Sequence, residues 1–151
     1  MRPASRPRQL LALRNPQEVA ASVAKRDGFT MGKGLGIWLR YTLDCERATR
    51  GQPRSVVAFD DLMADWRGTM ARAAHQLGEP WPALSPEAVA EIDGALKPNL
   101  KHHALPPPSA SSWRGLLAGR TYDAMRRLMA DPNDRAACRT LDLVSAVFRP
   151  F

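Results

Sequence analysis

Apolar residues along most of this chain recur every three or four positions, which is the spacing of amphipathic helices. The spacing predicts helices near residues 16–26, 33–50, 62–77, 86–96, 113–130 and 134–148. Two short segments, residues 9–14 and 54–59, are instead rich in consecutive apolar or β-branched residues and predict strands. The order strand, helix, helix, strand, helix predicts an α/β fold with few parallel strands and a predominance of helices.

Several predicted helices begin and end at residues that favour helix termini. Asn15 stands before a proline and is expected to cap the first helix, which Gly28 is expected to end. Asp60 and Asp61 are expected to cap the helix after the second strand, and Ser85 the helix after that. These signals set the predicted boundaries.

The predicted helices have apolar faces that we expect to pack inward. In the second helix this face consists of Leu35, Trp38, Leu39, Thr42 and Cys45. In the helix after the second strand it consists of Leu62, Trp66, Met70, Ala74 and Leu77. Residues 97–112 contain three consecutive prolines and predict a linker or lid. We therefore expect a body over residues 1–105 and a helical tail over 106–151 that packs on it.

The charge of the chain favours anionic partners. Its 151 residues carry a formal net charge of +7. Nucleotides, phosphorylated or sulfated molecules, nucleic acid and anionic membranes all fit such a charge. The arginines are spread along the chain, and the absence of a run of basic residues argues against nucleic acid.

Apolar runs and cysteines point to a cytoplasmic protein. No apolar run approaches the roughly 18 residues of a membrane span, and Leu10 to Leu13 is too short for a signal peptide. Cys45 and Cys138 form no CxxC pair, so we expect two reduced, partly buried thiols and no metal site.

The most informative segment is the junction of the first strand and helix. Arg14 ends the strand, and Ser22 follows it by eight positions in the helix. A phosphate dianion needs a guanidinium for charge and geometry, and a hydroxyl can add a further donor. An alternative interpretation is structural: the segment only caps a helix, Arg14 is solvated, and Ser22 packs against the sheet.

The Arg-Asn-Pro-x-Glu-Val-Ala-x-Ser pattern of residues 14–22 resembles the 3′-phosphate-binding segment of sulfotransferases. Those enzymes use 3′-phosphoadenosine 5′-phosphosulfate (PAPS) as sulfuryl donor. Residues 56–66, 77–81 and 100–103 are similar to later segments of bacterial members. The resemblance implies a partial P-loop-type sulfotransferase fold. It also implies that Arg14 and Ser22 hold the donor's 3′-phosphate, and that a hydroxyl or amine is the acceptor.

The chain also departs from this family. Sulfotransferases carry an earlier loop that wraps the 5′-phosphosulfate, and their general base generally comes from that half. No such loop precedes residue 10, and no GxxxxGK[ST] occurs. The glycine-rich residues 32–36 follow a helix, so we read them as the flexible start of the second helix rather than a phosphate cradle. We expect the 3′-phosphate-binding half of a truncated enzyme, which binds the nucleotide weakly and is inactive alone.

Three further residues are weaker candidates for contact with the donor or an anionic substrate. They are Lys101, His102 and His103, for which a solvated loop is an equal alternative. Adjacent histidines make a poor chelate, so metal binding is not expected. No residue is assigned as catalytic, and the acceptor stays open among polysaccharides, lipid-linked sugars and small molecules.

Two other functions compete with this one. A basic helical module could bind nucleic acid by charge alone, with strong salt dependence. A protein partner or oligomer could instead cover an exposed apolar strand edge at residues 9–14, because unpaired edges favour strand pairing.

Overall fold

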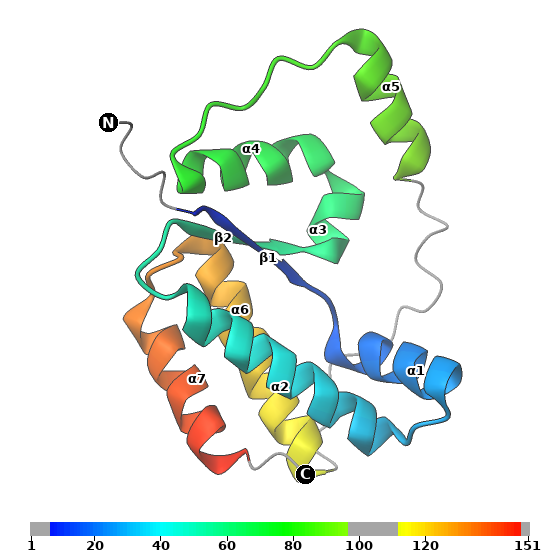
Figure 1. The fold of residues 1–151 in the computed structure, drawn as a ribbon, viewed down its shortest axis with the longest axis vertical. Helices are drawn as coiled ribbons and strands as arrows, with labels where there is room; N and C mark the ends of the chain where they lie inside the picture. Colours follow the sequence, from blue (N-terminus) through cyan, green and yellow to red (C-terminus); the bar gives the residue numbers. More distant parts are fainter. Residues whose placement is uncertain (1–6, 97–111, 149–151) are drawn as a thin grey trace.

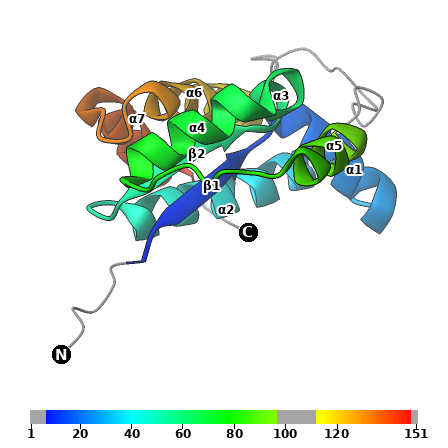
Figure 2. The same ribbon diagram turned by 90° about the horizontal axis from the view of Figure 1, so that it is seen from above.

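Two parallel strands lie at the centre of the molecule, with helices on both sides (Figures 1 and 2). The computed structural model describes residues 7–96 and 112–148. Its elements are β1 (Gln9–Leu13), α1 (Pro16–Asp27), α2 (Met31–Thr49), β2 (Arg54–Ala58), α3 (Phe59–Ala64), α4 (Trp66–Leu77), α5 (Pro86–Ala95), α6 (Trp113–Ala130) and α7 (Arg135–Val147). Helices α3 and α4 lie on one side of the strands, and α2, α6 and α7 lie on the other.

The strands pair in parallel, and their register runs from Gln9 opposite Arg54 to Leu13 opposite Ala58. The predicted α/β class with few parallel strands and a predominance of helices is therefore confirmed. Because the strands are parallel, their carboxyl ends lie at the same edge of the sheet. Arg14 follows β1 and Phe59 follows β2 at that edge.

The main core forms between one face of the sheet and helices α2, α6 and α7. Leu11 and Leu13 of β1 and Val56 and Ala58 of β2 are buried there. The helices contribute Leu35, Trp38, Leu39, Leu43, Leu117, Ala118, Ala124, Met125, Leu128, Met129, Ala137, Leu141 and Val144. On the opposite face, Ser55 of β2 donates a hydrogen bond to Gln76 of α4, whereas Leu10 of β1 is 50% exposed.

Both ends of α1 agree with the sequence analysis, and the start of α3 does not. The Asn15 side chain accepts a hydrogen bond from the backbone of Gln17, and Gly28 ends α1 in the left-handed conformation with φ 69°. The predicted capping role of Asp60 and Asp61 is wrong. Both lie inside the first turn of α3, where their negative charge interacts favourably with the partial positive charge at the N-terminus of the helix.

A second correction concerns the helix expected near residues 62–77. It is two helices, because Asp65 ends α3 and starts α4. The Asp65 carboxylate accepts a hydrogen bond from the backbone N–H of Gly68 at 3.0 Å, as an N-cap does.

The inward face of α2 also differs from the prediction. Cys45 is exposed, so the expectation that both thiols are partly buried is wrong for it, while Cys138 is half-buried. The buried face continues instead through Leu43 and Glu46. Because Glu46 is charged, a search for apolar residues at helical spacing does not find this part of the buried face.

Close packing of α1 and α2 explains the glycines at the start of α2. A Cβ added to Gly34 would lie 2.8 Å from the Cα of Ala20, which is closer than two packed atoms can approach. Residues 32–36 are therefore part of a regular helix, and the interpretation as a flexible lead-in is wrong.

Helix α5 is joined to α4 by polar contacts of Asp93. It has no buried residue, in contrast to α6 and α7. Asp93 of α5 accepts hydrogen bonds from Trp66 Nε1 at 2.8 Å and from Arg67 Nη2 at 2.7 Å. One carboxylate thus joins α5 to the start of α4.

Candidate functional site

The candidate site lies at the carboxyl edge of the sheet, where ligands commonly bind in open parallel α/β folds. Arg14 lies there because Leu13 is the last residue of β1, and Phe59 lies there because Ala58 is the last residue of β2. The Asn15 cap and the proline that follows start α1 immediately after Arg14. The sheet register therefore brings an arginine and an aromatic ring to one place.

The Arg14 side chain makes two contacts at this edge. Its Nε lies 3.1 Å from Oε2 of Glu18, and its Cζ lies 4.6 Å from the centroid of the Phe59 ring. The Arg14 side chain is 39% exposed, whereas the Glu18 side chain is 3% exposed. Glu18 and Phe59 thus hold part of the Arg14 side chain in place, and the rest of the side chain is accessible to solvent or a ligand.

Ser22 is exposed on α1, so the alternative in which it packs against the sheet is wrong. It follows Glu18 by four positions, and residues at this spacing lie on the same face of a helix. The described contacts of Arg14 are with Glu18 and Phe59, and they do not include Ser22. The structure therefore places Arg14 at the carboxyl edge of the sheet and Ser22 further along α1, and none of the described contacts of Arg14 joins the two.

Acidic residues and a second arginine lie close to this edge on α3 and α6. Arg126 Nη2 lies 3.9 Å from Asp61 Oδ1. A hydrogen bond with Tyr122, together with the charges of Asp61 and Asp60, raises the pKa of Arg126 above its usual value. Arg126 is exposed on α6. Its proximity to α3 was not visible from helical spacing.

The weaker candidates Lys101, His102 and His103 lie outside the described residues. Within residues 7–96 and 112–148, no three His, Cys, Asp or Glu side chains gather as metal ligands would. Over the same ranges, no helix has the length and apolar character needed to cross a membrane.

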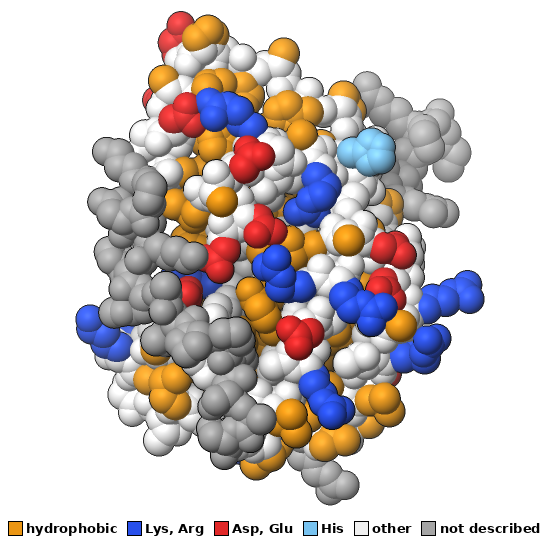
Figure 3. All heavy atoms as spheres, turned by 180° about the vertical axis from the view of Figure 1, so that it is seen from behind, with side chains coloured by type: hydrophobic (Ala, Val, Ile, Leu, Met, Phe, Trp, Pro, Cys, Tyr) orange, Lys and Arg blue, Asp and Glu red, His pale blue; other side chains and the backbone are white. Residues whose placement is uncertain are grey.

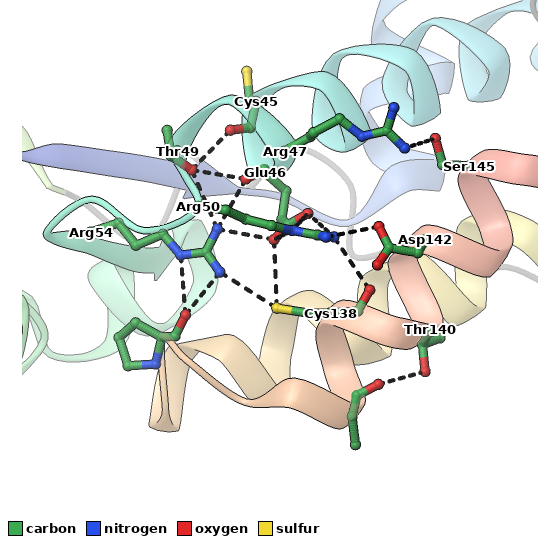
Figure 4. A network of polar contacts seen from close by, with 12 residues as sticks. Cys45, Glu46, Arg47, Thr49, Arg50, Arg54, Cys138, Thr140, Asp142 and Ser145 are labelled. Atoms are coloured by element: carbon green, nitrogen blue, oxygen red, sulfur yellow. Dashed lines mark hydrogen bonds and ion pairs between the residues drawn. The ribbon is translucent and has the colours of Figure 1, made fainter.

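A buried polar network was missed by the sequence analysis (Figure 4). Glu46 accepts hydrogen bonds from Arg54 Nη1 at 3.0 Å and from Arg50 Nη2 at 2.7 Å. Arg50 also reaches Asp142 of α7 at 2.8 Å, and the hydrogen bond to Asp142 is a further reason why the pKa of Arg50 is raised, after that to Glu46. Arg54 begins β2, so this network lies at the amino end of the strand, away from the candidate site.

The network has a structural role in the fold. Arg54 also donates to the carbonyl of Pro132, and its Nη2 lies 3.7 Å from the Cys138 sulfur. These contacts join α2, β2, α7 and the turn that precedes α7. The signal in the sequence was weak, because Glu46, Arg50 and Arg54 fall at a spacing that also describes a solvated helix surface.

Basic side chains do not form one continuous patch on the face shown in Figure 3, where lysines and arginines alternate with acidic residues. Many arginines in the described ranges are paired with carboxylates, including Arg26 with Asp27, Arg40 with Asp44 and Arg127 with Asp134. This arrangement does not favour the broad electrostatic footprint of a nucleic-acid-binding surface.

Comparisons with models of protein families, with characterised proteins and with solved structures find no match to this chain.

Proposed function

We propose that this chain is a sulfotransferase-like protein that binds PAPS through its 3′-phosphate at Arg14 and Ser22. The observation that supports this most is the position of Arg14. Its guanidinium lies at the carboxyl edge of a parallel sheet, directly before a capped helix, and it is partly exposed. We further propose that the fold is part of a P-loop-type sulfotransferase fold.

The chemistry of the site fits a phosphate. Among the described contacts, the hydrogen bond to Glu18 uses only the Nε–H of Arg14. The N–H donors of the two Nη groups therefore remain available to a ligand. A guanidinium binds a phosphate through two parallel hydrogen bonds, and the exposed hydroxyl of Ser22 supplies another donor. The start of α1 adds the partial positive charge of a helix N-terminus.

In the proposed reaction, an acceptor oxygen or nitrogen attacks the sulfur of PAPS in line with the leaving oxygen. A bond forms between acceptor and sulfur, the bond from sulfur to the 5′-phosphate oxygen breaks, and the acceptor loses a proton. Adenosine 3′,5′-bisphosphate leaves. The role of Arg14 and Ser22 is to bind the 3′-phosphate and so orient the donor, which lowers the entropic part of the barrier.

Isothermal titration calorimetry with adenosine 3′,5′-bisphosphate and adenosine 5′-monophosphate tests the proposal. We expect the first nucleotide to bind more tightly. Arg14→Ala should weaken it by about ten- to a hundredfold, because hydrogen bonds to charged groups contribute about 1.5–3 kcal/mol. Ser22→Ala should have a smaller effect, and Arg40→Ala, at an exposed helix position, should have none. Unchanged affinity in Arg14→Ala would contradict the proposal.

A second candidate function is the binding of a partner strand at β1. Gln9 donates its N–H to the carbonyl of Pro53, the residue before β2, at 2.9 Å. Along a strand, the backbone N–H and C=O groups of successive residues point alternately to its two sides. Those of Leu10 and Ala12 therefore point away from β2. In the described ranges β1 has β2 as its one strand neighbour. This open edge supports a protein partner or a second copy of the chain.

A further inference from the structure

We infer that Glu18 and Phe59 are positioning residues, which hold the guanidinium of Arg14 ready for a phosphate. The inference rests on the proposed function, because it concerns the same arginine. Neither the pattern of charges in the sequence nor the resemblance to sulfotransferases assigned Glu18 or Phe59 a role in binding.

Glu18 holds one edge of the guanidinium. Its side chain is 3% exposed, and a buried carboxylate is costly unless a positive group or hydrogen-bond donors compensate for the lost water. Arg14 meets this need through Nε at 3.1 Å. Because the carboxylate accepts from Nε, it anchors the edge that Nε shares with one Nη group, and the edge formed by the two Nη groups is left for a phosphate.

Phe59 holds one face of the guanidinium. It directly follows Ala58, the register partner of Leu13, so the end of β2 places the ring beside the end of β1. The Cζ of Arg14 lies 4.6 Å from the ring centroid, within the range of a cation–π contact. A ring on one face and a carboxylate on one edge restrict two different motions of the same planar group.

These restraints prepare Arg14 for binding. A free arginine side chain loses rotamer freedom when a ligand fixes it, and this loss weakens the observed affinity. A guanidinium that is ordered before the ligand arrives avoids most of that loss. The negative charge of Glu18 has the opposite effect, since it repels a phosphate. The two effects of Glu18 can therefore be separated by substitution.

The experiment is calorimetric titration of the full chain with adenosine 3′,5′-bisphosphate, comparing wild type with Glu18→Gln, Glu18→Ala and Phe59→Leu. Glu18→Gln keeps an acceptor for Nε and removes the charge, so it should bind at least as tightly as wild type. Glu18→Ala removes both and should bind at least about threefold more weakly than Glu18→Gln. Phe59→Leu should weaken binding by about two- to fivefold, the range of an exposed cation–π contact.

Asp44→Ala is the matched control, because Asp44 pairs with Arg40 at the same four-residue spacing on an exposed helix face. It should leave the affinity unchanged. Thermal unfolding of each variant shows that the protein being titrated is folded. In parallel, the NMR signal of the Arg14 Nε–H in the ligand-free protein should exchange faster with water in Glu18→Ala and Phe59→Leu, but not in Asp44→Ala.

The outcomes separate the inference from the proposed function. One outcome is that Arg14→Ala loses the preference for the 3′-phosphate, while the affinity of Glu18→Ala equals that of Glu18→Gln and the affinity of Phe59→Leu equals that of wild type. In that case the inference is wrong and the proposed function stands. If wild type does not distinguish the two nucleotides, the proposed function is wrong. The exchange rate of the Arg14 Nε–H then still decides whether Glu18 and Phe59 order the guanidinium.

Discussion

Arg54 Nη1 lies 3.0 Å from Glu46 Oε1, and both side chains are almost completely buried. Glu46→Ala should destabilise the protein by about 3–5 kcal/mol, because it leaves a buried arginine without its charge partner. Urea unfolding followed by circular dichroism measures this change. Asp44→Ala removes an exposed acid from the same helix, and it should change stability by less than about 1 kcal/mol. Equal effects of the two substitutions would show that the buried network does not stabilise the fold.

The contact of Gly34 with Ala20 leads to a second prediction. Gly34→Ala should destabilise the protein by about 1–3 kcal/mol, because the added methyl group would meet the backbone of α1 and force the two helices apart. Gly32→Ala is the control on the same helix. Its Cβ would lie 3.7 Å from Arg114, an ordinary contact, so it should be neutral or stabilising by up to about 1 kcal/mol. Thermal unfolding distinguishes the two, and the close approach of α1 and α2 is refuted if both variants gain stability.

The attachment of α5 should depend on pH. The hydrogen bonds from Arg67 and Trp66 hold the pKa of Asp93 below its usual value of 3.8. A carboxyl whose pKa is lowered by folding stabilises the folded state above its unfolded pKa, and this contribution is lost as the pH falls through the folded pKa. We therefore expect α5 to separate from α4 only below pH 3.8, with a change in tryptophan fluorescence.

Asp93→Asn is the direct check of that prediction. Asparagine can still accept from Trp66 but cannot form the ion pair with Arg67, so the acid-dependent fluorescence change should be lost or much smaller. A transition of the same size in Asp93→Asn would assign the change to another group.

The open edge of β1 leads to a fourth prediction. Leu10 is 50% exposed there, so Leu10→Lys should reduce any concentration-dependent association without lowering thermal stability. Leu143→Lys removes a 70% exposed leucine from α7 and should not affect association. Analytical ultracentrifugation over a range of concentrations measures both. If Leu143→Lys dissociates the protein equally, general surface hydrophobicity is the cause and strand pairing is not.

Local signals predicted much of the fold. Asn15, Gly28 and Ser85 act at helix termini as expected, because their effect depends on neighbours within one turn. The parallel pairing of the strands also followed from the order of the elements. Asp60 and Asp61 were misread because acidic residues favour both the cap and the first turn of a helix, and only the backbone distinguishes these positions.

Contacts between distant segments could not be predicted in the same way. Helical spacing counts apolar residues, so it overlooked Glu46, whose burial depends on arginines at other positions. At the candidate site, the sequence predicted a role for Arg14 but could not show that Phe59 contacts it, since Phe59 lies 45 residues further along the chain. Only the strand register brings those two side chains together.

The pairing of Leu13 with Ala58 therefore controls more than the sheet. A slip of one residue between the strands would turn the side chains of one strand to the opposite face. Arg14 and Phe59 would then point apart, and the stacked pair would be lost together with the burial of Leu11 and Leu13. Correct folding and the stacking of Arg14 on Phe59 thus have the same geometric requirement, and a misregistered chain would lose the proposed phosphate site as well as its core.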